Sequence, residues 1–250
     1  MAVRIKSARE IAIMREAGKI LADVHEQIKE IIVPGISTWE IDRKGAEFIR
    51  ERKCIPSFLN YNDYPASICV SLNDVVVHGI PNKKQRLFEG DIVSLDIGVI
   101  YNGYHSDSAR TYGVGKIDRE AERLIRITKE SFYKGIEYAR AGCYLYDIST
   151  AIQNYVEANG FSVVRDLVGH GIGQKLHEDP QVPNFKQKSR GMKLRAGMTL
   201  AIEPMVNAGT WEVWILEDDW TVVTKDGEKS AHYENTVLIT DGEPELLSMY

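Results

Sequence analysis

The order of its predicted elements constrains the fold of this chain more than any other feature. Two helical segments are followed by a set of short strands, and the same order then occurs a second time. Two structurally similar αβ halves explain this order, although no residue-level repeat accompanies it. Neither a linker nor a low-complexity segment separates the halves. We therefore expect one α+β domain over residues 1–250, whose halves, at about 7–115 and 118–240, share a central antiparallel sheet.

The first half begins with two helices that carry the same start signal. Ser7 with Glu10, and Ser37 with Glu40, each form the S-x-x-E pattern of a capping box, and apolar residues recur at helical spacing between 14 and 31. The aromatic stretch SFLNYNDYPAS is then typical of an irregular loop. Strands are predicted in SICVSL, VVVHGI, DIVSLDIGV and GYHSDSARTYGV, the last two joined by an Asn-Gly turn.

The second half repeats this order with its own helices and strands. One helix is predicted from about Asp118 to Ala141, followed by Gly142, and another from about 146 to 158, followed by Gly160. A strand is expected to end near the glycine-flanked His170. Further strands are predicted in FSVVRDLV, MTLAIEPMV, WEVWILED, WTVVTKD and HYENTVLIT.

Charge and composition exclude several classes of protein. The 31 basic and 36 acidic residues form no long like-charge block, which argues against a nucleic-acid surface or a polybasic membrane anchor and favours a small neutral or cationic substrate. The three cysteines form no C-x-x-C pair, and the N-terminus lacks the apolar segment of a secretory signal, so we expect a cytoplasmic protein. No apolar run approaches the roughly 20 residues that span a bilayer.

Four carboxylates occupy positions that call for an explanation. Asp96, Glu203 and Glu234 lie in segments that otherwise look buried, where an unpaired carboxylate is costly. The Asn-Gly turn sets Gly98 opposite Asp107, which puts Asp96 and Asp107 diagonally adjacent on one face of a hairpin. Taken singly, the aspartates fit two solvated edge residues as well as ligands, and each glutamate fits a paired core acid as well as a ligand.

Taken together with His170, the four carboxylates suit a metal centre. Their charge of −4 is balanced by two divalent ions, so the cluster is neutral only as a dinuclear site. One imidazole with four carboxylates is an oxygen-rich set. It suits a pair of Mn, Fe, Co or Zn ions better than it suits a structural zinc, which prefers thiolates and histidines. Two such ions can activate a water molecule and polarise a carbonyl group.

The stretch VGHGIGQKLHEDP around His170 fits neither of two known glycine- or histidine-containing patterns. A dinucleotide-binding loop requires G-x-G-x-x-G, but Gln174 stands at the third glycine position after Gly169 and Gly171. A zinc-protease helix requires H-E-x-x-H, and no histidine follows His177-Glu178 at that spacing. The glycines instead allow close backbone approach at a strand end.

The six histidines divide by their surroundings. Three lie at strand ends that carry glycine or proline, where functional groups tend to gather, and these are His78, His170 and His177. A structural role is expected for the other three, which are His25 in the first helix and His105 and His232 in strands beside the proposed ligands.

Five motifs, in this order and spacing, resemble those of the type I methionine aminopeptidases of bacteria: NDVVVHGIP, SLDIGVIYNGYHSDSART, GHGIGQKLHEDP, TLAIEPM and HYENTVLIT. The likeness extends from about Ile5 to Thr240. It implies the pita-bread (creatinase/aminopeptidase) fold, with two pseudo-symmetric αβ halves around a dinuclear metal centre. The implied activity is removal of the initiator methionine from nascent proteins whose second residue is small. The implied metal ligands are Asp96, Asp107, His170, Glu203 and Glu234.

The resemblance also implies roles for the remaining site residues. Glu203 would accept a proton from the attacking water, His177 would hydrogen-bond the scissile carbonyl, and His78 would contact the substrate nitrogen. An unbranched thioether packs well against aromatic edges. The implied methionine pocket is formed by Phe58, Tyr61, Tyr64, Cys69, His78, Leu176 and Trp220.

Two pocket positions depart from the pattern expected of this family. A cysteine is expected where Phe58 stands, and an aromatic residue where Leu176 stands. Our hypothesis is that one aromatic ring has moved across the pocket, which keeps methionine selectivity and alters the shape of inhibitor that fits.

The resemblance further implies cofactors and partners. It implies two divalent metal ions per chain, of Co, Mn, Fe or Zn, and allows an additional monovalent cation. The expected partners are nascent polypeptide N-termini at the ribosome, without sequence-specific nucleic-acid contacts and without a membrane. A monomer is expected.

Three other functions fit parts of the sequence. A proline-specific aminopeptidase or dipeptidase would use the same fold and ligands, but such enzymes usually carry an additional N-terminal domain, for which we see no room before Ser7. A non-catalytic binding protein on this fold would have lost ligands, whereas all five positions are intact. The ligand set alone permits a dinuclear phosphoesterase, but the aromatic loop and the lack of clustered arginines argue against a phosphate substrate.

Overall fold

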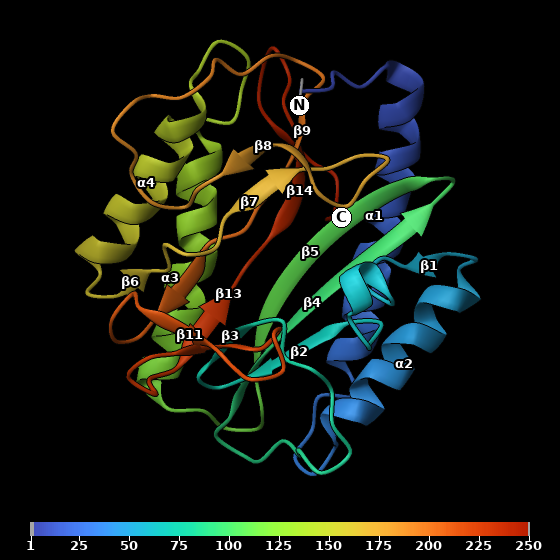
Figure 1. Cartoon of the computed structure of the whole chain (residues 1–250), viewed down its shortest axis with the longest axis vertical. Helices are drawn as coiled ribbons and strands as arrows, with labels where there is room; N and C mark the ends of the chain where they lie inside the picture. The colour runs from blue at the N-terminus through green and yellow to red at the C-terminus, as the bar shows by residue number, and fades with distance from the viewer. Residues whose placement is uncertain (1–2, 250) are drawn as a thin grey trace.

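Two pairs of helices frame the strands of the structure, which is a computed structural model that describes residues 3–249. Figure 1 shows one pair on each side of the molecule, with α1 passing behind the long strands β4 and β5. The first pair is α1 (Ala8–Lys29) and α2 (Thr38–Glu51), and the second is α3 (Arg119–Ile136) and α4 (Leu145–Ala158).

The helix starts agree with the sequence, and one helix end does not. Both capping boxes form, with the Ser7 and Ser37 side chains accepting from the backbone N–H groups of Glu10 and Glu40. Helix α3 ends at Ile136, so the prediction that it runs to Ala141 is wrong. After a tight turn, the N–H of Ala141 donates to the carbonyl of Thr240, and this tertiary contact replaces another helical turn.

In the first half, a long hairpin forms the centre of a four-stranded antiparallel sheet. The hairpin joins β4 (Ile92–Tyr101) to β5 (Tyr104–Gly113), and Gly98 pairs with Asp107 as the Asn-Gly turn predicted. Strands β1 (Ile55–Pro56) and β2 (Cys69–Leu72) pair with β4. The aromatic loop between them is irregular, with one short 3-10 turn, η1 (Tyr61–Asp63).

The remaining strands form three further antiparallel sheets. The five-stranded sheet has the order β15 (Glu245–Leu246), β14 (Asn235–Leu238), β9 (Thr199–Ile202), β7 (Gly169–Gly171) and β8 (Glu178–Val182). One three-stranded sheet contains β13 (Ser230–His232), β10 (Met205–Asn207) and β6 (Ser162–Val163), and the other contains β11 (Val213–Ile215), β12 (Val222–Thr224) and β3 (Val75–Val77).

Two predicted strands are broken at their acidic residue. The segment MTLAIEPMV divides into β9 and β10 around Glu203, and HYENTVLIT divides into β13 and β14 around Glu234. Pro204 has no N–H to donate to a strand ladder, which favours the first break. Both glutamates therefore lie at breaks between strands rather than within a continuous ladder.

Threonine side chains join the two halves at a seam between β5 and residues 232–236. The Thr111 hydroxyl accepts from the N–H of His232 at 2.8 Å and donates to its carbonyl at 2.9 Å. The Thr236 hydroxyl does the same with Asp107, at 2.9 Å in each direction. The central sheet is thus continued across the halves by side chains, and this seam places Asp107 beside Glu234.

Separate apolar clusters support each half, and a third lies between them. Helices α1 and α2 cover β2 and β4, and α3 and α4 pack with strands of the second half. The third cluster draws on both halves and includes Met14, Phe58, Tyr64, Cys69 and Leu176. Within residues 3–249, no helix has the length and apolar character needed to cross a bilayer.

Candidate metal centre and substrate pocket

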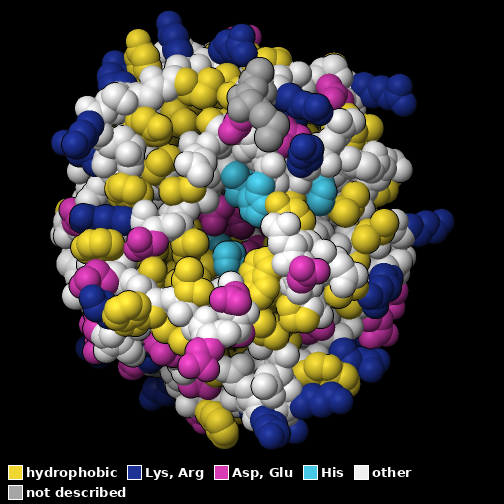
Figure 2. All heavy atoms as spheres, in the orientation of Figure 1, with side chains coloured by type: hydrophobic (Ala, Val, Ile, Leu, Met, Phe, Trp, Pro, Cys, Tyr) yellow, Lys and Arg dark blue, Asp and Glu magenta, His cyan; other side chains and the backbone are white. Residues whose placement is uncertain are grey.

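Five predicted ligands converge at the meeting point of the two halves. Asp96 and Asp107 come from the hairpin, His170 from β7, and Glu203 and Glu234 from the two strand breaks. Potential ligand atoms of Asp107, His170 and Glu234 all lie within 4.8 Å of one another. Nε2 of His170 lies 3.7 Å from Oε1 of Glu203. In Figure 2, histidine side chains surround a hollow with acidic side chains at its floor.

The carboxylates of this cluster are costly to ionise without a neighbouring positive charge. Burial raises the pKa of the Asp96 carboxyl to about 7. Burial and the neighbouring carboxylates hold the pKa values of Asp107, Glu203 and Glu234 well above their usual range. Buried oxygens of Asp96, Asp107 and Glu234 also have no hydrogen-bond partner. Among residues 3–249, no lysine or arginine forms an ion pair with these carboxylates, so divalent metal ions fit the site.

The His170 ring is oriented as a metal ligand would be. Its Nδ1 lies 2.9 Å from the Gly171 carbonyl, so Nδ1 carries the proton and Nε2 faces the carboxylates. Burial lowers the pKa of His170 to about 3, which keeps the ring neutral. A neutral imidazole with its second nitrogen hydrogen-bonded is the usual form of a histidine ligand.

His232 belongs to this neighbourhood more closely than its sequence position suggested. Its Nε2 lies 3.7 Å from Oε2 of Glu203, and the ring is buried. In the sequence, its position two residues before Glu234 is the one feature that could have marked His232 as a site residue. His25 contacts the carbonyl of Ser108, and His105 contacts the hydroxyl of Ser57, as structural residues would.

The predicted methionine pocket is one continuous cavity of about 160 Å³ beside the carboxylates. The Tyr64 and Trp220 rings meet edge to face at 5.0 Å, and His78 meets Trp220 in the same way at 5.9 Å. Asn62 also lines the cavity, although no sequence pattern marks it. All seven predicted pocket residues line this cavity: Phe58, Tyr61, Tyr64, Cys69, His78, Leu176 and Trp220.

The two residues that depart from the family pattern share the apolar cluster of this pocket. Phe58 and Leu176 are both buried, at 7% and 3% exposure. Gly98 makes room for the phenyl ring, because a Cβ at this position would lie 2.8 Å from Cε1 of Phe58. The ring at Phe58 is thus accommodated by a glycine on the neighbouring strand β4.

The two other predicted catalytic histidines, His78 and His177, line both the pocket and the larger cavity beside it. The Tyr61 hydroxyl lies 2.6 Å from Nδ1 of His177. Burial raises the pKa of Tyr61, so its hydroxyl is protonated near pH 7. When this hydroxyl donates to Nδ1, a neutral His177 ring carries its N–H on Nε2. Burial lowers the pKa of His78 to about 4, so this ring is also neutral near pH 7.

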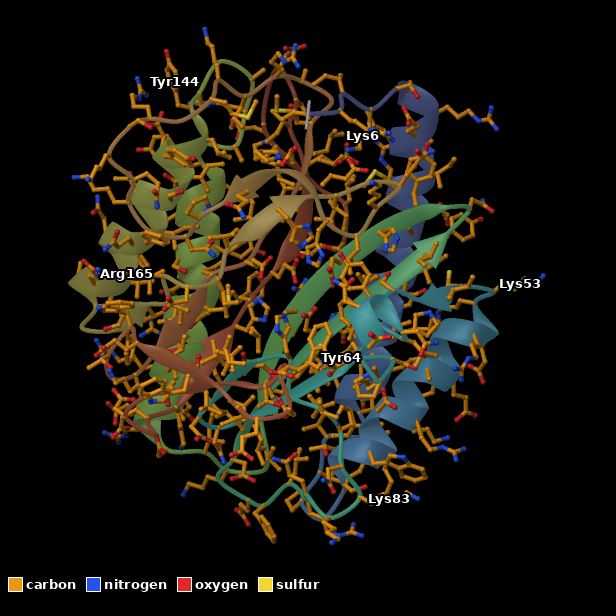
Figure 3. All side chains as sticks on the ribbon, viewed as in Figure 1. Lys6, Lys53, Tyr64, Lys83, Tyr144 and Arg165 are labelled. Carbon is orange, nitrogen blue, oxygen red and sulfur yellow. The ribbon has the colours of Figure 1, made fainter. Side chains whose placement is uncertain are left out.

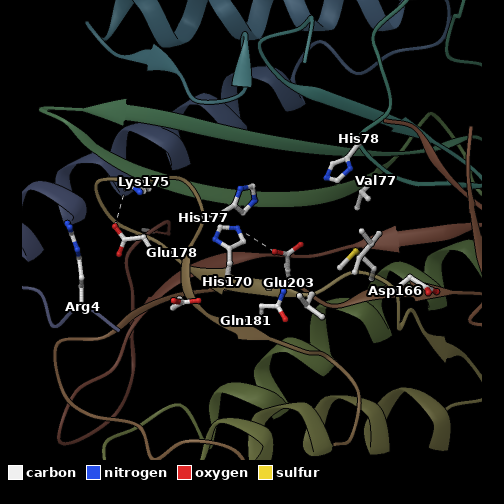
Figure 4. A pocket seen from close by; sticks show the side chains of 15 residues that line it. Arg4, Val77, His78, Asp166, His170, Lys175, His177, Glu178, Gln181 and Glu203 are labelled. Atoms are coloured by element: carbon white, nitrogen blue, oxygen red, sulfur yellow. Dashed lines mark hydrogen bonds and ion pairs between the residues drawn. The ribbon is translucent and has the colours of Figure 1, made fainter. Parts of the chain in front are cut away.

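A larger cavity of about 470 Å³ continues from the same histidines toward solvent. It shares His78, His170, His177 and Glu203 with the smaller cavity and extends to Arg4, Asp166 and Gln181. Figure 4 shows His78 and His177 facing one another across it. An extended chain can therefore lead away from the carboxylates while its first side chain occupies the aromatic pocket.

Comparisons with known proteins agree with this site. The model of metallopeptidase family M24 matches residues 12–241. The chain is 58% identical over 245 residues to the methionine aminopeptidase of Clostridium perfringens, with 98% of each chain covered. The crystal structure of methionine aminopeptidase from Thermotoga maritima is similar with a TM-score of 0.97 at 45% identity, and the match covers both chains completely.

A more distant similarity extends to proline-specific enzymes. The Xaa-Pro dipeptidase from Bacillus anthracis is similar with a TM-score of 0.78 at 25% identity, covering 98% of this chain and 62% of that one. The fold is the pita-bread fold, in agreement with the expectation from the sequence. The chain therefore belongs to metallopeptidase family M24 and, within that family, to the bacterial type I methionine aminopeptidases.

Proposed function

We propose that this chain, as a single catalytic domain, removes the N-terminal methionine of nascent polypeptides whose second residue is small. The observation that carries this proposal is the position of an aromatic cavity directly beside four carboxylates, of which Asp107 and Glu234 are buried. The cavity offers edges of Tyr64 and Trp220 to an unbranched thioether. The carboxylates supply the hard oxygen ligands of a hydrolytic metal centre.

The five ligands would hold two divalent ions, of Co, Mn, Fe or Zn. Two ions match the charge of four carboxylates, and His170 supplies the one nitrogen ligand. When bound, such ions lower the pKa of a water molecule and polarise a carbonyl group. An additional monovalent cation is compatible with this assignment.

Three side chains would carry the proton and charge movements of hydrolysis. Glu203 takes the proton of the attacking water, because its carboxylate lies at the cluster and its two oxygens face the rings of His170 and His232 rather than a lysine or arginine. His177 donates its Nε2–H to the scissile carbonyl as negative charge develops there. His78 contacts the nitrogen of the scissile bond from the opposite side of the cavity.

The cellular setting follows from the substrate. Nascent N-termini emerge at the ribosome, so we propose that the enzyme acts there, in the cytoplasm and as a monomer. No sequence-specific contact with nucleic acid is needed for this reaction.

The competing function is cleavage of Xaa-Pro peptides, which is considered because of the similarity to Xaa-Pro dipeptidase. Purification without chelators under anaerobic conditions, followed by metal analysis, gives the native ions and their number. Activity is then compared on Met-Ala-Ser and on an Xaa-Pro peptide. If only Met-Ala-Ser is hydrolysed, the proposal is supported. If the Xaa-Pro peptide is hydrolysed in preference, the proposal is overturned.

A further inference from the structure

The loop between β7 and β8 carries two residues of the pocket but has little regular backbone structure of its own. Residues 173–177 form a series of bends, and Leu176 and His177 project from it toward the substrate cavities. Such a loop needs contacts from outside to hold one conformation. The question is which residues supply them.

A buried ion pair from the other end of the chain reaches this loop. Nζ of Lys6 donates to Oε2 of Glu178 at 2.7 Å, and their side chains are 4% and 8% exposed. Lys6 is the only buried lysine or arginine among residues 3–249. Figure 3 places it on the segment that leads into α1.

Glu178 also contacts the loop backbone. Its second oxygen, Oε1, accepts from the N–H of Lys175 at 3.2 Å, directly before Leu176 and His177. Figure 4 shows this contact at the edge of the larger cavity. Because each carboxylate oxygen has its own partner, Glu178 connects the Lys6 ammonium to the backbone that presents the two pocket residues.

The catalytic assignment does not explain why residue 173 is a glycine, but the position of Lys6 does. A Cβ at Gly173 would lie 2.6 Å from Cε of Lys6 and 2.7 Å from Oε1 of Glu178. Its φ angle is not in the left-handed region, so backbone freedom is not the reason for the glycine. A side chain at this position would push the ends of Lys6 and Glu178 aside, so the third glycine of GHGIG leaves room for their ion pair.

The backbone of Lys6 is itself fixed on both sides. Its N–H donates to the carbonyl of Gly197 at 2.8 Å. The next residue, Ser7, is the N-cap of α1, and the capping-box residue Glu10 also accepts from the hydroxyl of Tyr104. The ammonium therefore approaches the loop from a rigid support.

We propose that Lys6 is a positioning residue of the active site. Through Glu178 it holds loop 173–178 so that His177 meets the substrate carbonyl and Leu176 closes the methionine pocket. This inference rests on the proposed function for the role of His177. The anchoring of the loop itself is a separate property that can be measured without substrate.

The test compares Lys6→Met with a matched control, Arg15→Met. The control breaks another ion pair of the N-terminal region, between Arg15 and Glu245, which does not contact the loop. In Lys6→Met we expect faster hydrogen exchange at the amides of residues 175–177 and about 10- to 100-fold lower kcat/KM on Met-Ala-Ser. Arg15→Met is expected to leave both quantities unchanged.

A second background separates positioning from general destabilisation. If Lys6 acts on kcat through His177, Lys6→Met has little further effect on kcat in a His177→Ala protein, while KM still rises through Leu176. Glu178→Gln keeps an acceptor for the Lys175 N–H and is expected to give a smaller defect of the same kind. This variant tests the inference if Lys6→Met does not fold.

Two results overturn the inference. One is wild-type exchange and kinetics in folded Lys6→Met or Glu178→Gln protein, and the other is an undiminished kcat defect in the His177→Ala background. Wild-type kcat in His177→Ala alone contradicts the proposed function instead, and the exchange measurement then still reports whether Lys6 anchors the loop.

Discussion

Glu203 differs from the other carboxylates of the cluster in what faces it. Its two oxygens each lie 3.7 Å from a histidine Nε2, one from His170 and one from His232. Burial lowers the pKa of both rings to about 3, so neither competes for a proton near pH 7. Glu203 is therefore the group in this cluster best placed to accept a proton from an attacking water.

Replacing Glu203 by Gln tests this role. The amide keeps the shape of the side chain but cannot take up a proton, so we expect a kcat about 10²- to 10⁴-fold lower. In chelator, thermal unfolding should occur at the same or a higher temperature, because a neutral amide replaces a carboxyl that must hold a proton to be neutral. Steady-state kinetics on Met-Ala-Ser are measured beside the metal content of each preparation. Near wild-type turnover in fully metal-loaded Glu203→Gln protein would contradict the assignment.

Phe58 and Leu176 are expected to behave as a coupled pair. Leu176→Phe alone overpacks the cluster and should destabilise the protein by about 1–3 kcal/mol. Adding Phe58→Cys removes the competing ring, so the double variant should recover most of that loss while still preferring methionine to leucine substrates.

A double-mutant cycle of unfolding free energies measures this coupling. Simple additivity of the two changes would show that the rings do not share one space. Our hypothesis of a moved aromatic ring would be contradicted if neither wild type nor Phe58→Cys discriminated between methionine and norleucine or leucine substrates.

At the scale of single elements, β7 shows how glycines place a ligand. His170 stands between Gly169 and Gly171 in a strand of three residues. A Cβ at Gly169 would lie 2.3 Å from the carbonyl oxygen of Ala201, and one at Gly171 would lie 2.2 Å from that of Asp179. Real side chains do not make such contacts with backbone, so the neighbouring strands can approach His170 this closely only beside glycine.

Gly171→Ala should therefore push β8 away from β7. We expect a loss of about 1–3 kcal/mol in unfolding free energy and a lower metal affinity, because the His170 ring moves with its strand. Gly242→Ala is the matched control, since the nearest atom to its Cβ is 4.0 Å away and its φ angle is not left-handed. Equal metal affinity in the two variants would show that the close strand approach does not position His170.

The sequence predicted elements best where their signals are local. The capping boxes at Ser7 and Ser37 gave the helix starts, and the Asn-Gly turn gave the register that brings Asp96 toward Asp107. Asp96 could be recognised because a carboxylate conflicts with the apolar strand around it. The end of α3 at Ile136 depends on the contact with Thr240, about a hundred residues away, which no local pattern records.

The same limit explains which site residues the sequence missed. His232 stands two residues before Glu234, but this spacing does not show that its ring faces Glu203. The contact between Lys6 and Glu178 joins positions 172 residues apart. Without a motif to mark it, such a contact becomes visible only in three dimensions.

At the scale of the whole molecule, the active site lies where the two halves meet, so metal binding and folding are linked. The hairpin supplies two carboxylates, the second half supplies two more with His170, and Thr111 and Thr236 bridge the halves beside them. Without metal, the folded protein holds protons on these carboxyls, because burial raises the pKa of Asp96 to about 7 and those of the other three well above normal. The unfolded chain releases such protons near pH 4.

The metal-free protein is therefore expected to lose stability as pH rises above about 6.5. Each carboxyl with a raised folded-state pKa stabilises the fold fully below its unfolded pKa near 4. It loses about 1.4 kcal/mol of this stabilisation per pH unit as pH rises toward its folded-state pKa, above which nothing more is lost. The buried histidines have lowered pKa values, so their contribution changes only below about pH 6.5 and does not mask the effect. We expect Tm in chelator to fall from about pH 6.5 until the folded-state pKa values of the carboxyls are passed.

Divalent metal should reverse this trend, because it binds the ionised carboxylates and displaces their protons. Melting curves at pH 7, 8 and 9, with chelator or with Mn²⁺, give the metal-dependent rise in Tm, which should grow with pH. Glu203→Gln is the control, since it removes one of the four carboxyls and should make the fall in chelator shallower. A metal-free Tm that stays constant or rises from pH 7 to 9 would mean that the carboxyls are already ionised in the folded apoprotein. The cluster would then have some other source of positive charge.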